Sequence, residues 1–395
     1  MPRKYRGTAV TVGAAYAAQG LGYATVVTAL PVYKERLSLG DDLVSVLLLG
    51  TCVAAAVGSV LADLIAVRWG SRQALCAGLG AQAVALAVMA SVPPLVPYVC
   101  ALTVYGIGLG TVDASVNMQG VLVQKRAGVL LLGRFYAAFT AAAIAGALLM
   151  SGFAASGTLA TGPLLVAAAV HTTVALTGAR RFDQSRAAHR AHDAPAERTP
   201  LPRRGIWAVG GLVFAAFVVD SAVSTWSSVY LTYGLETSAA VAPLGYAAYQ
   251  AAVLVSRLAT DSLVRALGNA GTALLSICVG VLGCALVASV RDTTGAIAGF
   301  AAAGLATGAL VPLAFSAAGE LRPARSDEVI ARVNLFNYAG ALAGAVSLGL
   351  VATGPALGTA FVIPALLLLA VTPVARRAGS KRAAPRKTLA PETAD

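Results

Sequence analysis

The sequence predicts an all-α integral membrane protein with twelve transmembrane helices, arranged as two six-helix pseudo-repeats. The observations are an apolar composition, twelve apolar stretches of membrane-spanning length, and one internal register that relates the two halves. Hydrophobic residues make up 58% of the 395 residues and charged residues 12%, whereas a typical soluble domain is about 25% charged. A soluble protein of this composition could not cover its surface with polar groups, so we expect most of that surface to face lipid.

Each apolar stretch is long enough to cross about 30 Å of hydrocarbon, which takes about 20 helical residues. The stretches lie at 8–32, 42–67, 73–92, 96–121, 134–155, 160–179, 206–232, 238–260, 270–290, 294–318, 330–352 and 356–375. The first follows a short basic segment, as a signal peptide does. It is too long for a signal peptide, and we therefore interpret it as the first span.

The basic residues give the orientation, because lysine and arginine gather on the cytoplasmic side of membrane proteins. With the N-terminus inside, the outer loops hold only Lys34, Arg36 and Arg291, and the other 26 of the 29 basic residues lie on the cytoplasmic side. The net charge of +12 is thus explained by topology and not by nucleic-acid binding. We expect a protein of the bacterial cytoplasmic membrane, monomeric, with both termini inside.

The polar segments divide the chain into four parts. We predict an N-terminal bundle over 1–179, a cytoplasmic linker over 180–205, a C-terminal bundle over 206–375 and a cytoplasmic tail over 376–395. The linker is polar and shows no apolar periodicity. The tail is basic and rich in proline and alanine, a composition that suits contact with anionic lipid headgroups.

Motifs for other functions are missing from the sequence. The five cysteines lie in apolar segments without a Cys-x-x-Cys spacing, so they indicate neither a disulfide framework nor a metal site. The Gly-x-Gly-x-Gly at 106–110 lies inside a span, where it favours close helix packing over a phosphate site. With no catalytic signature in the chain, we expect no enzyme activity, no cofactor and no metal.

An offset of 198 residues aligns distinctive residues of the two halves. The pairs are Asp63 with Asp261, Gly70 with Gly268, Gly106 with Gly304, Gly110 with Gly308, Arg134 with Arg332, and Gly146 with Gly344. One register across several pairs of spans indicates a parallel repeat. Transporters built from such repeats move solutes by rocking the halves about a site near the midplane.

At this point the sequence resembles the major facilitator superfamily. The segment GSVLADLIAVRWGSRQAL (58–75) is similar to its Gly-x-x-x-Asp-Arg-x-Gly-Arg signature, although the spacing between Asp63 and Arg68 differs. GIGLGTVDASVNMQG (106–120) is similar to the fucose-permease-like bacterial branch, whose fourth helix carries an acid followed four residues later by Asn. DSAVSTWSSVYL (220–231) and GLATGALVPLAFSAAG (304–319) resemble the same branch.

The first span departs from that branch. Members that carry out proton–sugar symport have a second acid in the first helix, and Val27 takes its place here. The resemblance therefore implies proton coupling through Asp113 without a two-acid relay, and it does not imply fucose as the substrate.

Two acids lie deep in predicted spans, Asp113 and Asp220. An ionisable group in the membrane costs several kcal/mol and usually marks function. No lysine or arginine lies at a comparable depth in the predicted spans, and removal from water favours the neutral form of a carboxyl group. We predict that both acids take part in proton coupling. The alternative is that each is a protonated hydrogen-bond donor that ties helices together.

Polar residues at helical spacing around the acids predict a substrate-binding lining. The candidates are Asn117, Gln19, Tyr23, Ser224, Trp226, Tyr246, Tyr249, Gln250, Asn334 and Asn337. The alternative for each is an interhelical hydrogen bond. His171 stands alone in its span, and we interpret it as a packing element.

Charged residues at the cytoplasmic ends of the spans predict a latch between the halves. They are Asp63, Arg68 and Arg72, with Arg257, Asp261 and Arg265 as counterparts in the second half. The alternative role is plain anchoring at the cytoplasmic surface.

Together these features predict a proton-coupled secondary transporter of a small polar or amphipathic solute, with protons and the lipid bilayer as its other partners. A proton-driven exporter of a drug or secondary metabolite is the alternative. The fifth span, RFYAAFTAAAIAGALLMSG, contains no proline, whereas drug antiporters of the superfamily usually have a Gly-Pro-rich helix there. A receptor or scaffold with a transporter-like fold is the candidate from another class.

Overall fold

The structure is a computed structural model that describes residues 3–91, 93–128, 131–156, 161–183, 201–322, 326–352 and 354–378. The first group of helices comprises α1 (Arg3–Arg36), α2 (Asp41–Trp69), α3 (Ser71–Ala90), α4 (Leu95–Ala127), α5 (Leu132–Ala155) and α6 (Thr161–Arg181). The second group comprises α7 (Arg203–Val229), the π-turn η1 (Tyr230–Gly234), α8 (Ala242–Ser289), α9 (Thr293–Leu321), α10 (Ser326–Val351), the 3₁₀ turn η3 (Gly354–Ala356), α11 (Leu357–Ala360) and α12 (Val362–Ala378). The described residues thus form an all-helical fold, as predicted.

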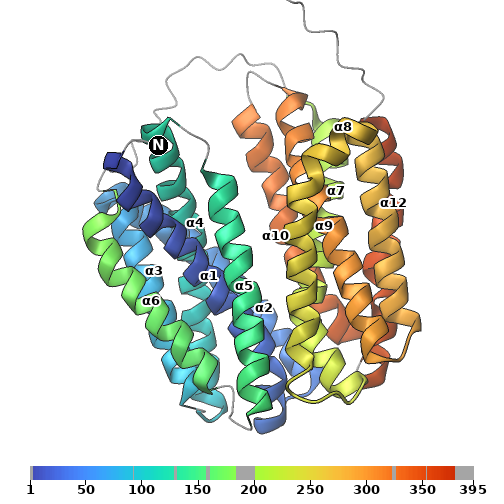
Figure 1. Ribbon diagram of the computed structural model, residues 1–395, viewed down its shortest axis with the longest axis horizontal. Coiled ribbons are helices and arrows are strands. Elements are labelled where there is room, and N and C mark those ends of the chain that lie inside the picture. The colour runs from blue at the N-terminus through green and yellow to red at the C-terminus, as the bar shows by residue number, and fades with distance from the viewer. Residues whose placement is uncertain are drawn as a thin grey trace, which may run out of the picture.

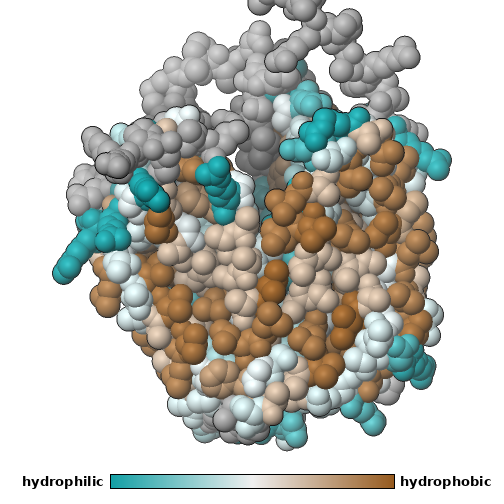
Figure 2. Space-filling view, viewed as in Figure 1, coloured by the Kyte–Doolittle hydropathy of each residue, from teal (hydrophilic) through white to brown (hydrophobic). Residues whose placement is uncertain are grey.

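Apolar side chains cover the middle of the molecule. On the face seen in Figure 2, hydrophobic residues occupy the middle of the molecule and hydrophilic residues gather toward the two ends. Large apolar side chains are exposed to the surroundings, and Leu258, Leu176 and Val96 are at least two-thirds exposed. Within the described residues, ten helices are long and apolar enough to cross a membrane. The surface is therefore the kind that lipid, and not water, solvates.

Three predicted spans are not separate members of this set of ten. α1 is long enough, but Tyr16, Gln19 and Tyr23 interrupt its apolar residues, and it is not among the ten. The predicted spans 238–260 and 270–290 both lie in α8, a 48-residue element that leaves helical geometry at Gly268. Figure 1 shows the chain reversing direction there, so that α8 has two arms.

Gly268 and its partner in the repeat, Gly70, make the same kind of turn. Gly70 joins α2 to α3 with φ 101°, and Gly268 joins the two arms of α8 with φ 70°. These angles lie in the region that residues with a Cβ rarely adopt. The 198-residue register therefore aligns two hairpin turns that both require glycine.

The register also appears in the helix contacts of each half. A Cβ built on Gly106 would meet the carbonyl oxygen of Thr51 at 2.8 Å, and one on Gly304 would meet that of Tyr249, which is 198 residues after Thr51. Likewise, a Cβ on Gly110 would meet the carbonyl oxygen of Ala55, and one on Gly308 would meet that of Val253 at 2.6 Å. The paired glycines thus let α4 approach α2, and α9 approach α8, through equivalent backbone positions.

The two groups of helices lie side by side, with α1–α6 on one side and α7–α12 on the other (Figure 1). Contacts between the groups run from α2 to α10, from α5 to α8 and from α1 to α7. One apolar cluster crosses this boundary, joining Val27, Val44 and Ala143 of the first group to residues such as Val223 of the second. The first group has two further apolar clusters of its own.

The predicted polar segments fall largely outside the described residues. α6 runs to Arg181 and α7 begins at Arg203, so helix covers both edges of the predicted linker 180–205. The residues 184–200 within it lie outside the described ranges, as do residues 379–395 of the predicted tail. The described helix ends otherwise lie within a few residues of the predicted ones.

We predict that Gly110→Ala and Gly308→Ala both destabilise the protein, because the added Cβ would press on a backbone carbonyl that cannot rotate away. Overpacking of this kind costs about 1–3 kcal/mol. The measurement is the apparent melting temperature of the purified protein in detergent. Gly50→Ala is the control, since a Cβ on Gly50, also inside a helix, meets nothing within 4 Å. Equal melting temperatures for all three variants would contradict the proposed packing.

Candidate functional site

Asp113 lies midway along α4 and is exposed. Glycine packing fixes the direction in which this part of α4 faces. Gly106 and Gly110 pack closely against α2, and Asp113 and Asn117 follow them by seven residues on the same helix face. No hydrogen bond or ion pair links the Asp113 carboxylate to another described residue. An exposed carboxylate at this depth of a spanning helix indicates a water-accessible space between the two groups of helices.

Asn117 connects α4 to two tyrosines. Its Oδ1 accepts from the hydroxyl of Tyr16 on α1 at 2.6 Å and from the hydroxyl of Tyr136 on α5 at 2.9 Å. Its Nδ2 donates to the backbone oxygen of Asp113 at 2.8 Å. The Asn117 amide thus positions two rings next to Asp113. Its oxygen has no capacity left for a solute, since both lone pairs are used.

Asp220 lies on α7 and is held by the second half. The hydroxyl of Tyr249 on α8 donates to its Oδ1 at 2.5 Å, and the same hydroxyl lies 2.9 Å from Oγ1 of Thr307 on α9. Tyr249 is fully buried, whereas Asp220 is half-buried. The structure therefore brings the predicted Asp220 and Tyr249 together.

A contact between predicted residues also crosses the boundary between the groups. Tyr23 of α1 faces Tyr246 of α8 with ring centroids 6.5 Å apart, and Gln250 donates to the Tyr246 hydroxyl at 2.6 Å. The ring of Tyr246 also stacks on that of Tyr249 at 6.5 Å. The two halves therefore meet through aromatic side chains close to Asp220.

Arg257 stands between the halves. Its guanidinium donates to Oγ1 of Thr140 on α5 at 3.2 Å, its side chain is exposed, and its charge acts on Asp220 and Tyr136. α4 and α8 begin at the same end of the molecule, so at 1.5 Å per residue Asp113 lies about 27 Å and Arg257 about 22 Å from that end. Arg257 thus lies at a depth comparable to that of Asp113, contrary to the expectation that no lysine or arginine does, although it forms no ion pair with either acid among the described residues. The eighth span was predicted to end at residue 260, which placed Arg257 close to the membrane surface, but the helix continues to Gly268.

Several predicted lining residues lie inside helix packing. Trp226 is fully buried and its indole N–H donates to the backbone oxygen of Ala345 at 2.9 Å. Gln19 is 3% exposed and donates to the backbone oxygen of Leu109 at 3.2 Å. Ser224 is buried without a hydrogen-bond partner among the described residues. For Trp226 and Gln19 the geometry favours the alternative of an interhelical hydrogen bond.

Asn334 and Asn337 are less enclosed than the residues that lie inside helix packing. Both are half-buried on α10, and the amide of Asn337 donates to Oδ1 of Asn334 at 3.2 Å. Tyr338, the next residue, is 52% exposed. This part of α10 presents polar groups that still have free hydrogen-bonding capacity.

His171 is buried in α6, as its isolation in the sequence suggested. Its Nδ1 lies 2.8 Å from the backbone oxygen of Ala167, and its ring packs against Gly22 of α1. Its Nε2 has no partner in the described part of the chain. These contacts agree with a packing element.

The predicted latch residues lie at the end that carries the N-terminus. Asp63, Arg68, Asp261 and Arg265 are exposed, and Arg72 is half-buried. Arg68 lies over the ring of Trp69 at 4.9 Å, and Arg265 donates to Oγ of Ser262 at 2.9 Å on its own helix. Among the described residues none of these five forms an ion pair. Of the six predicted residues, only Arg257 reaches across to the other half.

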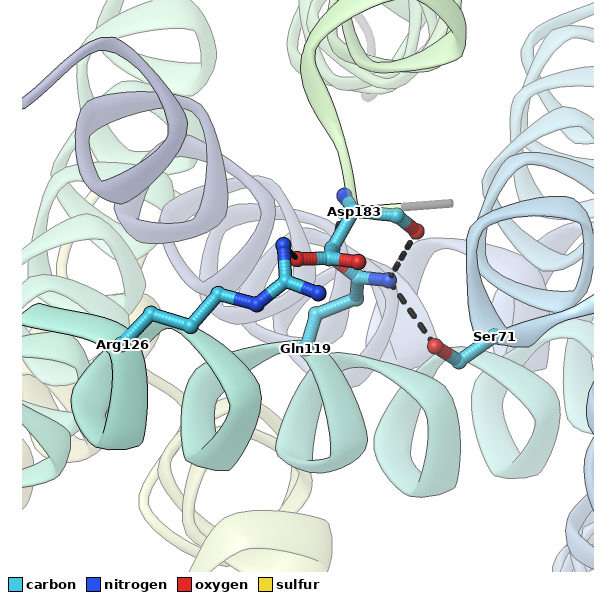
Figure 3. A network of polar contacts seen from close by, with 4 residues as sticks. All are labelled: Ser71, Gln119, Arg126 and Asp183. Atoms are coloured by element: carbon cyan, nitrogen blue, oxygen red, sulfur yellow. Dashed lines mark hydrogen bonds and ion pairs between the residues drawn. The ribbon is translucent and has the colours of Figure 1, made fainter. Parts of the chain in front are cut away.

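A polar network that sequence reasoning missed ties the end of α6 to α3 and α4 (Figure 3). The Gln119 amide donates to Ser71 Oγ at 2.9 Å and to the backbone oxygen of Asp183 at 3.0 Å, and it accepts from the Asp183 N–H at 2.9 Å. Arg126 forms an ion pair with the Asp183 carboxylate. Gln119 was the available signal, since it is a polar residue in an apolar span two positions after Asn117.

At the opposite end, contacts join the two groups of helices. The hydroxyl of Tyr233 in η1 donates to the backbone oxygen of Pro31 at 2.7 Å, and Lys34 lies 4.3 Å from the centre of the Tyr233 ring. Lys34 also forms an ion pair with Asp41 at 2.6 Å. Ser151 of α5 donates to the backbone oxygen of Ala240 at 2.5 Å.

The two ends therefore differ. Figure 1 shows the groups converging at the Tyr233 end and separated at the end that carries the N-terminus, where Figure 2 shows a notch between them. The acids, Tyr136 and Arg257 lie between these ends. This geometry is that of a two-bundle carrier that is closed at one end and open at the other.

Comparisons with known proteins agree with this geometry. Residues 12–298 match the Major Facilitator Superfamily. An uncharacterized MFS-type transporter of Yersinia pestis is 29% identical over 93% of this chain and 94% of its own length. The membrane protein MosC of Rhizobium meliloti is 25% identical over 90% of this chain and 86% of its own length.

Solved structures share the fold at low sequence identity. A variant of the nucleoside transporter NupG has a TM-score of 0.75 at 13% identity, covering 94% of this chain and 99% of that chain. A bacterial homolog of the human lysosomal transporter Spinster, in an inward-facing and occupied conformation, has a TM-score of 0.71 at 11% identity, covering 96% and 98%. The family match and the relatives along nearly the whole chain lead to one conclusion: the chain belongs to the Major Facilitator Superfamily and is a membrane transporter.

Proposed function

We propose that the protein is a proton-coupled secondary transporter that moves a small polar or amphipathic solute by alternating access. The observation that carries this proposal is Asp113, an exposed acid midway along a spanning helix. A charged group there costs several kcal/mol, and the family match favours a transport role for it over an enzymatic one. A carboxyl group that faces water without a fixed partner is free to gain and lose a proton as the cavity changes its access.

The topology that we propose has twelve crossings. The ten apolar helices provide ten, α1 adds one, and the second arm of α8 adds another. The two bundles then comprise 1–179 and 206–375, in a monomer of the bacterial cytoplasmic membrane. The positive-inside rule puts the N-terminus in the cytoplasm, so the open end would face the cytoplasm. Asp113 followed by Asn117 supports a place in the fucose-permease-like branch.

The solute site in this proposal lies between Asp113 on one side and Asp220 on the other. Tyr136, Arg257 and the Asn334–Asn337 pair provide polar groups around it. Closure of the open end would bring the charged residues Asp63, Arg68, Arg72, Asp261 and Arg265 toward one another, which is the state in which the predicted latch would form.

The direct test is a ligand screen followed by transport. Purified protein is screened by thermal shift against sugars, polyols, amino acids and antibiotics, because a bound ligand stabilises by RT ln(1 + [L]/Kd). Each hit is then followed in proteoliposomes under an imposed pH gradient, inside-acid or inside-alkaline. If the solute accumulates on the side toward which protons flow, the result supports symport. If it accumulates on the side from which protons flow, the result supports the proton-driven exporter. A bound ligand that never moves would indicate a receptor.

We predict that Asp113→Asn lowers gradient-driven accumulation of the screened solute by about tenfold or more, because the amide cannot carry a proton through the membrane. Exchange of labelled for unlabelled solute without a gradient should be retained, since this exchange requires no net proton movement. Asp42→Asn is the matched control, as Asp42 is exposed in the first turn of α2. Normal accumulation and an unchanged response to an uncoupler in Asp113→Asn would exclude the proposed coupling.

We predict that Tyr233→Ala opens the closed end, because it removes both the hydrogen bond to Pro31 and the ring under Lys34. Spin labels at Leu95 and Thr294, placed after replacement of the five native cysteines, report the distance between the halves at this end. The distance distribution should move to longer values in Tyr233→Ala and less so in Tyr233→Phe, which keeps the ring. Identical distributions in all three proteins would show that Tyr233 does not hold the halves together.

A further inference from the structure

We propose that Arg257 binds an anionic group of the transported solute, so that the substrate is a small organic acid or zwitterion that carries a carboxylate or a similar oxyanion. The inference rests on the proposed function, because it takes the space between the halves as the transport path. The argument begins with the position of Arg257 on α8. Tyr246, Gln250 and Arg257 follow one another at spacings of four and seven residues, which places them on one helix face.

The contacts of Arg257 leave most of its guanidinium free. A guanidinium has five N–H donors in a planar fork that matches a carboxylate or phosphate. Its hydrogen bond within the described chain goes to Thr140, which is 1% exposed, while the side chain of Arg257 itself is exposed. Thr140 belongs to the other half, so the guanidinium is held at the boundary between the halves, and its side chain is exposed there.

The charge of Arg257 has no contact partner, unlike two other basic residues. Lys34 pairs with Asp41 and Arg126 pairs with Asp183, whereas no described carboxylate lies within ion-pair distance of Arg257. A cation in a partly enclosed site is favoured when an anion neutralises it through charge-assisted hydrogen bonds. A solute oxyanion would supply both the charge and the acceptors.

Neighbouring groups link this site to the proton. Asp220 on α7 lies within electrostatic reach of Arg257. Tyr136 on α5 does so too, and it is also within electrostatic reach of Asp113 and Tyr338. An ionised Asp220 would compete with a solute anion for the guanidinium, and a protonated Asp220 would not. Proton binding and anion binding therefore favour each other, as linkage requires of two ligands with a positive coupling.

The test uses purified full-length protein and matched pairs of probes in which only one member carries a carboxylate: glucuronate against glucose, quinate against inositol, and alanine against alaninamide. Melting temperatures are measured at equal pH and at an ionic strength balanced with sodium chloride. We expect the carboxylate-bearing member of at least one pair to raise the melting temperature more than its counterpart without a carboxylate. Equal shifts within every pair, or no shift with any carboxylate, would overturn the proposal.

Variants separate recognition from folding. Arg257→Gln should abolish the carboxylate-specific shift, Arg257→Lys should retain part of it, and Thr140→Val should retain it because the charge remains. Arg291→Gln is the control for a basic residue exposed at the opposite end. The ligand-free melting temperature and a monodisperse elution profile check that each variant is folded. A full carboxylate-specific shift in Arg257→Gln would overturn the proposal.

The outcome is distinguishable from failure of the proposed function. An Arg257-dependent carboxylate shift without proton-coupled transport would refute the coupling and leave the anion site. Proton-coupled transport of a neutral solute, with no Arg257-dependent shift, would refute the anion site and leave the proposed function.

Discussion

The close approach of α4 to α2 is the contact on which the candidate site depends. Gly106 and Gly110 leave no room for a Cβ against the backbone of α2, so they fix how α4 is rotated. Helices that cross at such a point diverge beyond it. Because Asp113 and Asn117 follow the glycines by seven residues, the face that packs against α2 at the crossing becomes the face that opens to the cavity nearly two turns later. The second half repeats the crossing at Gly304 and Gly308, but places Val311 and Phe315 at the equivalent positions.

This asymmetry gives the two acids different surroundings. Asp113 has no hydrogen-bond or ion-pair partner for its carboxylate among the described residues and is exposed, whereas Asp220 accepts a hydrogen bond from Tyr249, which in turn contacts Thr307. A fixed donor holds Asp220 in one position and couples it to α8 and α9. The exposed acid is therefore the better candidate for proton exchange with the cavity, and the anchored acid is the better candidate for sensing the charge of Arg257.

Much of the fold could be predicted from the sequence, because span length, apolar composition and the repeat register are local or periodic properties. Which polar residues face a cavity is harder to predict from the sequence. Trp226 and Gln19 lie on the same kinds of helix as Tyr246 and Asp220, but their polar atoms bind backbone oxygens of neighbouring helices. Hydropathy cannot separate these cases, since both place a polar group in an apolar helix. The depth of Arg257 was missed for a related reason. Hydropathy ended the eighth span at residue 260, three residues after Arg257, whereas the helix continues to the break at Gly268.

The contacts that close one end are suited to a reversible transition. Tyr233 with Pro31, Lys34 with Tyr233 and Ser151 with Ala240 are single hydrogen bonds or a cation–π contact, each worth about 0.5–1.5 kcal/mol. The sum of these polar contacts, apart from the apolar cluster that also crosses the boundary, is a few kcal/mol, which is similar to the differential binding energy that a ligand can supply to shift a two-state equilibrium. A network of buried ion pairs at this end would hold one state too firmly. Weak contacts of this kind suit a transporter, because the free energy of ligand binding can outweigh them and shift the protein to its other state.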